Sequence, residues 1–221
     1  MNVTEATQRR ASIRSFLPDP VTDEQIKDLL EVASRAPSGG NVQPWRVYVI
    51  NGDSMERFRS FISSRKPGDS EYPVYPPSLQ EPYRTNRYEL GEAMYEKLGI
   101  PREDKPARLA HLARNFDFFG APAAFFCFIE RNMGAAQWSD LGMFLQTFML
   151  LAVEAGLEVT AWHVDHRLRP TSAAEGRSVV EVAIGLGARA RRVLAPVIDG
   201  PNLEARARNA RRVELPPGVL T

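Results

Sequence analysis

The sequence contains almost no cysteine, and this excludes several kinds of protein. Among its 221 residues only Cys127 is a cysteine. A single cysteine cannot form an intramolecular disulfide or a cysteine-rich metal cluster. Cys127 lies inside an apolar run at 123–129, so we interpret it as a core residue and expect a reducing, cytoplasmic location.

Long hydrophobic runs and an excess of one charge are also absent. No stretch approaches the roughly 18 apolar residues of a transmembrane helix, and the first residues lack the apolar segment of a signal peptide. Lys and Arg number 28 against 27 Asp and Glu, which gives a formal charge of +1. We therefore expect neither a membrane nor a nucleic acid as a partner.

The remaining composition is that of an ordinary globular protein. Hydrophobic residues make up 43% of the chain without counting glycine. The length suits one large domain or two small ones, and we predict a single domain over residues 1–221.

Hydrophobic periodicity predicts a series of helices and strands. One helix at 22–33 begins with the capping-box pair Thr22 and Gln25. A longer apolar helix is predicted at 141–155, capped by Ser139 and Asp140 and stopped by Gly156. The other predictions are a helix at 88–98, strands at 45–50, 123–130 and 179–186, and a proline-rich extended excursion at 67–83.

A first candidate site is the basic segment near the N-terminus. Arg10, Ser12 and Arg14 are two residues apart, so an extended backbone projects them to one side. Two guanidinium groups and a hydroxyl suit a phosphate, because Arg binds planar oxyanions in a bidentate manner. The alternative is a basic run that is simply solvated.

A second candidate is the loop between the helix at 22–33 and the next strand. Its glycines allow a close approach of the backbone to a ligand, while Ser38, Asn41 and Gln43 could bind the edge of a planar heterocycle. Trp45 would hold the loop against the core. The alternative is an ordinary helix-to-strand connection, in which these residue types cap and turn the chain.

Taken together, the two segments resemble the flavin-dependent nitroreductase family. The motifs are Arg-x-Ser-x-Arg-x-Phe-Leu-Pro at 10–18 and Arg-Ala-Pro-Ser-Gly-Gly-Asn-x-Gln-Pro-Trp at 35–45. Further similarity includes Phe-Gly-Ala-Pro at 119–122 and Gln-Trp-Ser-Asp-Leu-Gly-Met-Phe at 137–144. The resemblance covers roughly residues 5–158.

The resemblance implies an α+β fold, with a mixed sheet wrapped by helices, and a homodimer that binds FMN at its interface. It implies that the basic segment, Arg10, Ser12 and Arg14, holds the phosphate and ribityl end of FMN. The loop of the other subunit would line the isoalloxazine through Pro37, Ser38, Gly39, Asn41 and Gln43. Arg84 and Arg87 are weaker candidates, for which surface charge is the alternative, and Arg206 and Arg208 loosely match a family motif near the phosphate.

The activity implied by the resemblance is hydride transfer from NAD(P)H through the flavin to a nitroaromatic, quinone or related acceptor, in a ping-pong cycle. No catalytic side chain is predicted, since the cofactor carries the chemistry and no nucleophile-elbow motif is present. Other flavin chemistry on the same fold, such as reductive dehalogenation or flavin fragmentation, is an alternative. His163, Asp165 and His166 are interpreted as surface residues, so no metal is predicted.

The composition changes after about residue 158. All Phe, Tyr and Met residues lie before this point, and no Lys follows Lys105. One hypothesis is that the segment at 159–221 is read in a shifted frame, and the alternative is a divergent but functional C-terminus. A flavin-binding protein without turnover, or a partly folded product that does not bind flavin, are therefore further alternatives.

Overall fold

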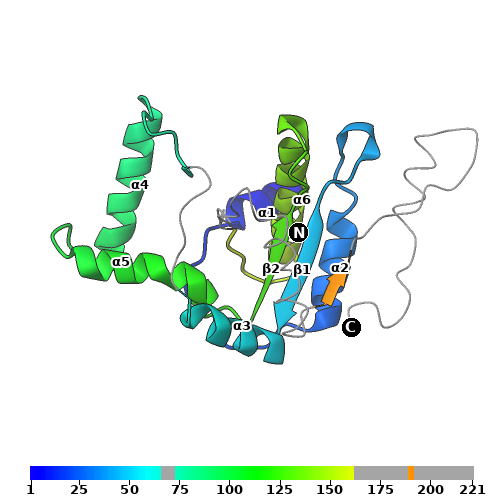
Figure 1. The fold of residues 1–221 in the computed structure, drawn as a ribbon, viewed down its shortest axis with the longest axis horizontal. Helices are drawn as coiled ribbons and strands as arrows, with labels where there is room; N and C mark the ends of the chain where they lie inside the picture. Colours follow the sequence, from blue (N-terminus) through cyan, green and yellow to red (C-terminus); the bar gives the residue numbers. More distant parts are fainter. Residues whose placement is uncertain (66–72, 162–188, 192–221) are drawn as a thin grey trace, which may run out of the picture.

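Figure 1 shows a body built around a small β-sheet, with a two-helix arm extending from it. The computed structural model describes residues 1–65, 73–161 and 189–191. The arm consists of α4 (Tyr83–Lys97) and α5 (Lys105–Ala113). The body contains helices α1 (Val3–Arg9), α2 (Asp23–Ala33), α3 (Asp53–Ser63) and α6 (Ala135–Glu154), and the 3-10 helices η1 (Gly39–Asn41) and η2 (Arg114–Gly120).

The sheet places β1 (Arg46–Asn51) between β2 (Ala123–Phe128) and β3 (Arg189–Arg191). Both pairs are antiparallel, with Val47 opposite Cys127 on one side and Arg191 on the other. The β-branched and aromatic residues of β1 and β2 favour this extended conformation. The strands predicted at 45–50 and 123–130 are therefore confirmed, whereas the parallel pair of a mixed sheet does not occur among the three described strands.

The N-terminus of α2 forms the predicted capping box. The Thr22 hydroxyl accepts a hydrogen bond from the Gln25 backbone N–H at 3.1 Å, and the Gln25 side chain accepts one from the Thr22 N–H at 2.8 Å. These bonds satisfy N–H groups that have no partner within the helix. Helix α2 buries Ile26 and Ala33, which places its apolar face toward α6.

Helix α6 begins at Ala135, six residues before the predicted start at 141. The Gln137 side chain accepts a hydrogen bond from the Gly134 N–H at 3.0 Å, so the helix starts there. The prediction that Ser139 and Asp140 cap this helix is wrong, because both lie inside it. The predicted stop is confirmed, since Gly156 follows the helix with the left-handed φ of 78° typical of a helix end.

The two faces of the sheet carry separate hydrophobic clusters. On one face, α2 and α6 pack around Trp45 and Phe144, with Phe125 and Cys127 of β2 against them. On the other face, Ile50 and Met55 form a smaller cluster with Phe58, Phe118 and Phe126. Alternate residues of β2 therefore point to opposite faces, as the two-residue period of a strand requires. Cys127 is part of the first cluster, and burial raises the pKa of its thiol to about 12.

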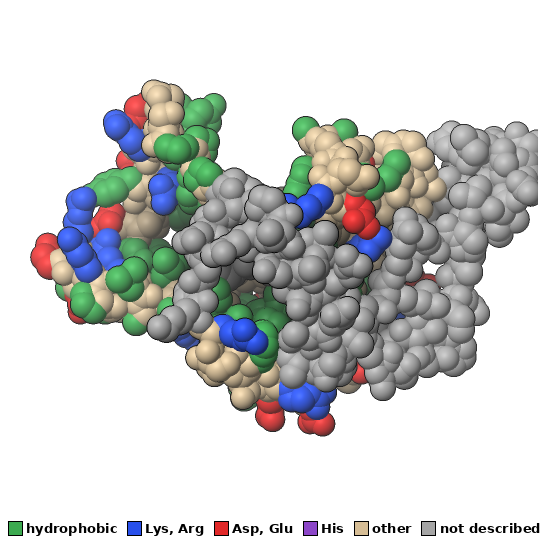
Figure 2. Space-filling model, viewed as in Figure 1, with side chains coloured by type: hydrophobic (Ala, Val, Ile, Leu, Met, Phe, Trp, Pro, Cys, Tyr) green, Lys and Arg blue, Asp and Glu red, His purple; other side chains and the backbone are tan. Residues whose placement is uncertain are grey.

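The arm departs from the body and exposes most of its side chains. Helix α4 starts at Tyr83, five residues before the predicted helix at 88–98, and none of its residues is buried. Figure 2 shows hydrophobic, basic and acidic side chains mixed on the arm. Residues 73–82 are irregular, as the predicted excursion requires. Residues 66–72 and the predicted strand at 179–186 lie outside the described residues.

Candidate functional site

The loop that joins α2 to β1 has an unusual backbone. Gly40, Asn41 and Gln43 have φ angles of 58°, 57° and 48°. This left-handed region is free of strain for glycine and tolerated by Asn, but it is strained for most other residues. Such residues persist where their surroundings hold them, and they concentrate at functional sites. Phe118 and Phe119 of η2 share this backbone region, so the strained backbone supports the loop as a candidate site only together with its polar side chains.

Hydrogen bonds within the loop bring together the side chains that the sequence singled out. The Ser38 hydroxyl accepts a hydrogen bond from the Gln43 backbone N–H at 3.0 Å. The Gln43 side-chain amide donates to the Asn41 carbonyl oxygen Oδ1 at 3.1 Å. Gln43 is buried, whereas Ser38 and Asn41 are half-buried. The loop is thus a small network of polar groups.

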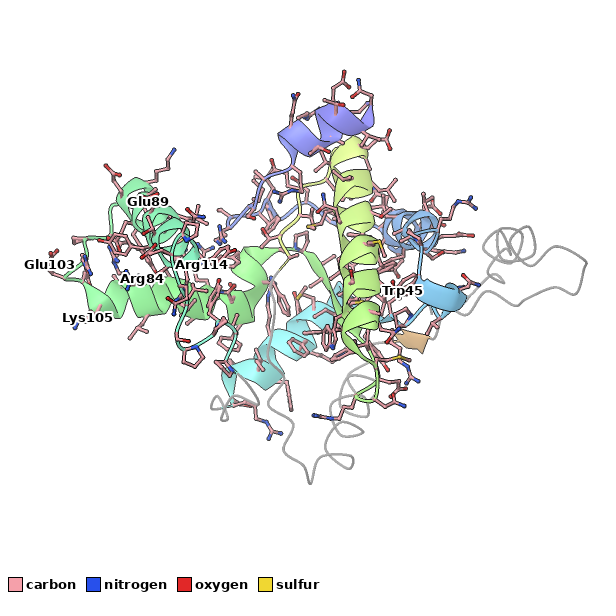
Figure 3. The ribbon with its side chains drawn as sticks, turned by 90° about the horizontal axis from the view of Figure 1, so that it is seen from above. Trp45, Arg84, Glu89, Glu103, Lys105 and Arg114 are labelled. Atoms are coloured by element: carbon pink, nitrogen blue, oxygen red, sulfur yellow. The ribbon has the colours of Figure 1, made fainter. Side chains whose placement is uncertain are left out.

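Helix α6 holds the loop at two points. The Gly39 N–H donates to Oδ2 of Asp140 at 3.2 Å. The Trp45 ring stacks on Phe144, with centroids 4.9 Å apart and planes at 12°. Because Asp140 and Phe144 are four residues apart, they share one helix face. Trp45 is 2% exposed and lies beside α6 in Figure 3, which confirms the prediction that it holds the loop against the core.

The basic segment near the N-terminus is held more lightly. Arg10 follows the last residue of α1, and its backbone N–H donates to the Ala6 carbonyl at 2.9 Å. Beyond Arg10 the chain has no regular structure, and Nη1 of Arg14 donates to the Ser12 carbonyl at 3.5 Å. Within the described ranges, neither arginine forms an ion pair with a carboxylate. Their charge is therefore available to an anion.

The N-terminus and the loop contact opposite parts of α6. The N-terminal amine lies 3.8 Å from Oε1 of Glu154, and the Thr160 hydroxyl, just beyond the helix, donates to the Ile13 carbonyl. The loop instead contacts Asp140. These two positions on α6 are 14 residues apart, which is roughly 21 Å at the rise of an α-helix. Within one chain, the N-terminus and the loop are therefore separated along α6, and the basic segment follows the N-terminus and contacts Thr160, beyond the end of this helix.

The weaker arginine candidates lie on the arm and have local partners. Nε of Arg84 donates to Glu81 at 2.6 Å, and the Arg87 guanidinium lies 4.1 Å from the centroid of the Tyr75 ring. Figure 3 shows Arg84 far from Trp45. These contacts agree with the surface-charge alternative. Arg206 and Arg208 lie outside the residues that the structure describes.

A buried histidine, which the sequence analysis did not single out, lies where the arm meets the body. His111 packs 6.1 Å from Tyr95 and 5.8 Å from Phe119, measured between ring centroids. In the described part of the chain its Nε2 has no hydrogen-bond partner. Burial lowers the pKa of His111, and the charges of Arg114 and Arg14 lower it further. A lone histidine on an amphipathic helix carries no sequence signal of this environment.

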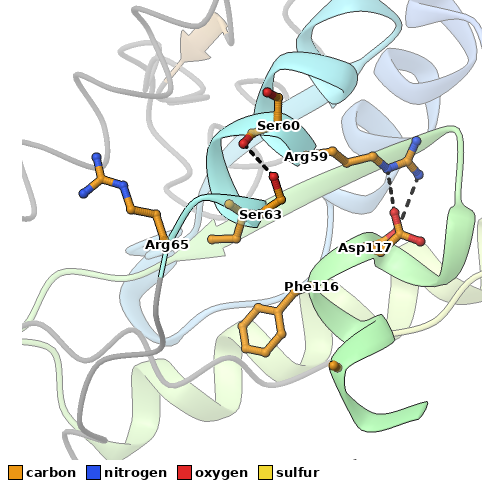
Figure 4. Close-up of a pocket in the computed structure, with 8 residues that line it drawn as sticks. Arg59, Ser60, Ser63, Arg65, Phe116 and Asp117 are labelled. Carbon is orange, nitrogen blue, oxygen red and sulfur yellow. Dashed lines mark hydrogen bonds and ion pairs between the residues drawn. The ribbon is translucent and has the colours of Figure 1, made fainter. Parts of the chain in front are cut away.

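Two cavities lie elsewhere in the body. One of about 980 Å³ runs along β2 and α6 and is mainly apolar, with the buried Asn115 in its wall. The other, of about 560 Å³, lies between α3 and η2, where Nε of Arg59 is 3.1 Å from Oδ1 of Asp117 (Figure 4). Among the residues that line these two cavities, none belongs to the loop at 36–45.

Comparison with known protein families identifies the family to which the chain belongs. A family model described as "Nitroreductase family" matches residues 7–164. This chain belongs to the nitroreductase family. The match includes the basic segment, the loop, α6 and the arm, and it ends before Arg206 and Arg208. The resemblance seen in the sequence is thus confirmed, and with it the α+β nitroreductase fold and the expectation of a nitroreductase-type oxidoreductase.

Individual nitroreductases are similar over most of their length. The chain is 36% identical to nitrobenzene nitroreductase of Ectopseudomonas oleovorans over 176 residues, which cover 74% of this chain and 76% of that protein. A crystal structure of the FMN and NADPH-dependent nitroreductase NfnB from Sphigopyxis sp. strain HMH is 40% identical, with a TM-score of 0.67 over 72% of this chain and 73% of that one. The FMN-dependent NfnB of Mycobacterium smegmatis, solved with NADPH, is 25% identical with a TM-score of 0.67, over 83% and 82% of the two chains.

The described part of the nitroreductase chain has neither a cluster of metal-ligating side chains nor a membrane-spanning helix. Across residues 1–65, 73–161 and 189–191, no three His, Cys, Asp or Glu side chains are grouped as metal ligands would be. His163, Asp165 and His166 lie outside these ranges, so the prediction of no metal stays untested. In the same ranges, no helix has the length and apolar character needed to span a bilayer.

Proposed function

We propose that this nitroreductase is an FMN-dependent enzyme that transfers hydride from NAD(P)H to a nitroaromatic, quinone or related small acceptor. The observation that carries the proposal is the strained polar loop anchored on α6, within the residues that match the family. The names of the similar proteins support the cofactor and the electron donor, since both NfnB structures are described as FMN-dependent and linked to NADPH.

The basic segment has the chemistry required to hold the phosphate of FMN. Arg10 and Arg14 carry positive charge without a carboxylate partner among the described residues, and Ser12 between them supplies a hydroxyl. Hydrogen bonds from guanidinium to phosphate are stronger than those between neutral groups. We assign the phosphate and ribityl end of FMN to these three residues.

The loop has the chemistry required to bind the polar edge of the flavin ring. Asn41 and Gln43 offer amide donors and acceptors, and Ser38 offers a hydroxyl. Pro37 and Gly39 would line the ring through their backbone. Because Asp140, Phe144 and the internal hydrogen bonds hold this loop, its polar groups are in place before a ligand arrives, which lowers the entropic cost of binding.

This division of roles explains why no catalytic side chain is needed. When bound, FMN supplies the ring atoms that accept hydride and release it again. The residues of the chain bind the cofactor, orient its ring and cover one side of it. Arg84, Arg87, Arg206 and Arg208 stay weaker candidates for additional contacts to the phosphate or the flavin edge.

We infer that two chains build each site. Within one chain the N-terminal amine and the loop contact residues of α6 that lie roughly 21 Å apart, and Ile13 of the basic segment contacts Thr160, beyond the end of the helix. One FMN molecule can contact both groups of residues more easily when the basic segment comes from one chain and the loop comes from the other. The protein is then a cytoplasmic homodimer in which residues 1–221 form one domain, with 159–221 atypical of the family.

The proposed kinetic mechanism follows from the use of one cofactor by two substrates. NAD(P)H and the acceptor would occupy the same place beside the flavin ring in turn, which is a ping-pong cycle. Steady-state rates at several fixed acceptor concentrations test this, because a ping-pong enzyme gives parallel lines in double-reciprocal plots. Intersecting lines would contradict it.

The whole proposal is tested by adding FMN to the purified protein and then NADPH under anaerobic conditions. We expect FMN to bind near one per chain, its visible absorption to bleach on NADPH addition, and the absorption to return when a nitroaromatic is added. A protein that takes up no FMN would contradict the cofactor assignment.

A second candidate function is flavin binding without turnover. It is favoured by one observation, namely that the family match ends at residue 164, well before Arg206 and Arg208. A protein that takes up FMN but does not oxidise NADPH in the same experiment would support this alternative.

A further inference from the structure

A buried carboxylate in the second turn of α6 is not explained by the packing around it. Asp140 is 5% exposed and belongs to the same helix face as Phe144. In the described chain, its carboxylate accepts one hydrogen bond, from the Gly39 N–H at 3.2 Å. Burying a charge is costly unless it is paired and well hydrogen-bonded. One neutral donor offsets little of this cost, so core stability alone does not account for an aspartate here.

The single hydrogen bond of Asp140 reaches the first residue of the strained turn. Gly39 begins η1, and the turn continues with the Asn41 N–H donating to Ser38 and the Val42 N–H donating to Gly39. The Gly39 N–H has no acceptor within this turn, so Asp140 supplies one. A Cβ built on Gly39 would lie 4.0 Å from Oδ2 of Asp140, an ordinary contact. The hydrogen bond, and not steric exclusion, therefore fixes the start of the turn.

The opposite end of the loop is fixed by the stacking of Trp45 on Phe144. Asp140 and Phe144 thus hold the two ends of the loop from one helix face, while the left-handed residues Asn41 and Gln43 lie between them. A turn with strained residues relaxes when one of its anchors is removed.

We propose that Asp140 is a positioning residue for the flavin site. Its carboxylate holds the Gly39 N–H and thereby keeps the turn at 38–43 in the conformation that binds the cofactor. The role toward flavin rests on the proposed function, but the effect on the loop does not, so the two can be measured separately.

Hydrogen exchange in protein freed of FMN tests the effect on the loop. Asp140→Ala removes the acceptor. We expect the Gly39 amide to exchange at least about tenfold faster, because loss of a hydrogen bond to a charged group shifts the opening equilibrium of the loop by more than tenfold. Asp140→Asn keeps a carbonyl oxygen as acceptor but loses the charge, so exchange should rise much less than in Asp140→Ala. Leu141→Ala is the matched control, because it opens the neighbouring core position and leaves the hydrogen bond in place. Exchange of Gly39 that is unchanged in Asp140→Ala, or that rises equally in Leu141→Ala, would overturn the proposal.

A fluorescence titration with FMN then tests the role toward the cofactor. We expect Asp140→Ala to weaken FMN binding about tenfold and Asp140→Asn to restore most of it, while both variants keep the wild-type circular dichroism. Asparagine that behaves like alanine would overturn the hydrogen-bond account. Wild-type protein that binds no FMN, although the exchange results are as expected, would show that the proposed function has failed while the bond to the loop stands.

Discussion

The loop at 36–45 and the arm of α4 and α5 both carry residues that the family resemblance assigns to the cofactor, but they are built in opposite ways. The loop is fixed on α6 by a partly buried hydrogen bond and by the stacking of Trp45 on Phe144. Helix α4 has no buried residue, and Arg84 contacts Glu81 within its own segment. Polar groups on the loop are therefore positioned by the core, whereas those on the arm are positioned by surface contacts.

This difference bears on which predicted residues can form a precise site. A binding group held by packed neighbours loses little freedom when its ligand arrives, whereas an exposed side chain must be ordered at that moment. Exposed ion pairs also contribute little to the fold. We therefore expect substitutions in the loop and in its support to have much larger effects than substitutions on the arm.

Removal of the Phe144 ring should give the largest effect on stability. Phe144 is 1% exposed, and Phe144→Ala should lower the free energy of unfolding by about 3–5 kcal/mol, because it leaves a cavity under Trp45. Leu90→Ala on the arm, where Leu90 is 73% exposed, should change it by less than about 0.5 kcal/mol. Denaturation with urea measures both variants, and similar losses would contradict the contrast between loop and arm.

Removal of a guanidinium from the basic segment should give the next largest effect, on cofactor affinity. Arg10→Ala should raise the dissociation constant of FMN by about tenfold to a hundredfold, since hydrogen bonds between charged groups are worth about 1.5–3 kcal/mol. Arg84→Ala removes the same charge from the arm and should change the constant by less than about twofold. A titration followed by flavin fluorescence measures the dissociation constant of both variants. An equal loss of FMN affinity in the two would indicate that the arm also binds the phosphate.

The pH dependence of stability should reveal His111, which lies at the junction of arm and body. Burial lowers its pKa, and Arg114 and Arg14 add to this effect, so the unfolded chain takes up a proton below about pH 6.5 that the folded chain does not. Stability should therefore fall as the pH drops below this value, until the lowered pKa of the folded state is reached. In His111→Gln this part of the decrease should vanish, as unfolding from pH 8 to pH 5 would show. If His111→Gln has the same dependence of stability on pH as the wild type, other titratable groups cause the decrease.

The pair that joins the two helices of the arm should give the smallest effect. Arg108 donates to both oxygens of Glu92, at 2.7 and 3.0 Å, and this hydrogen bonding lowers the pKa of Glu92. The pair is partly exposed, so solvent screens its contribution. Glu92→Gln should leave the Tm at pH 7 unchanged within error. A clear decrease would mean that the arm is held as firmly as the loop.

Local sequence signals predicted several elements well. Thr22 and Gln25 form the capping box at α2 because the residues that make it are only three apart. Most of the run predicted at 123–130 forms β2, because its aromatic residues suit a half-buried strand that packs against a hydrophobic cluster on each face. The polar residues of the loop and the anchoring role of Trp45 also followed from composition and position.

Signals that depend on distant contacts were missed. Ser139 and Asp140 match a helix cap in sequence, but Gly134 and Gln137 start α6 earlier, and Asp140 is used by Gly39, which lies 101 residues away in the chain. The environment of His111 depends on Phe119, Tyr95 and two arginines that no local pattern brings together. Capping and periodicity describe a few neighbouring residues, so they cannot indicate such contacts.

The central claim is that the core-held loop of one chain and the basic segment of another form one FMN site, and subunit mixing tests it most directly. One chain carries Arg10→Ala with Arg14→Ala, and the other carries Ser38→Ala with Asn41→Ala. Each variant alone should lose flavin. In a purified mixed dimer, one site receives both intact halves, so we predict about half of the wild-type flavin content and bleaching of that flavin by NADPH. Mixed dimers without flavin, formed from chains that fold as the wild type does, would show that each site belongs to a single chain and would contradict the account.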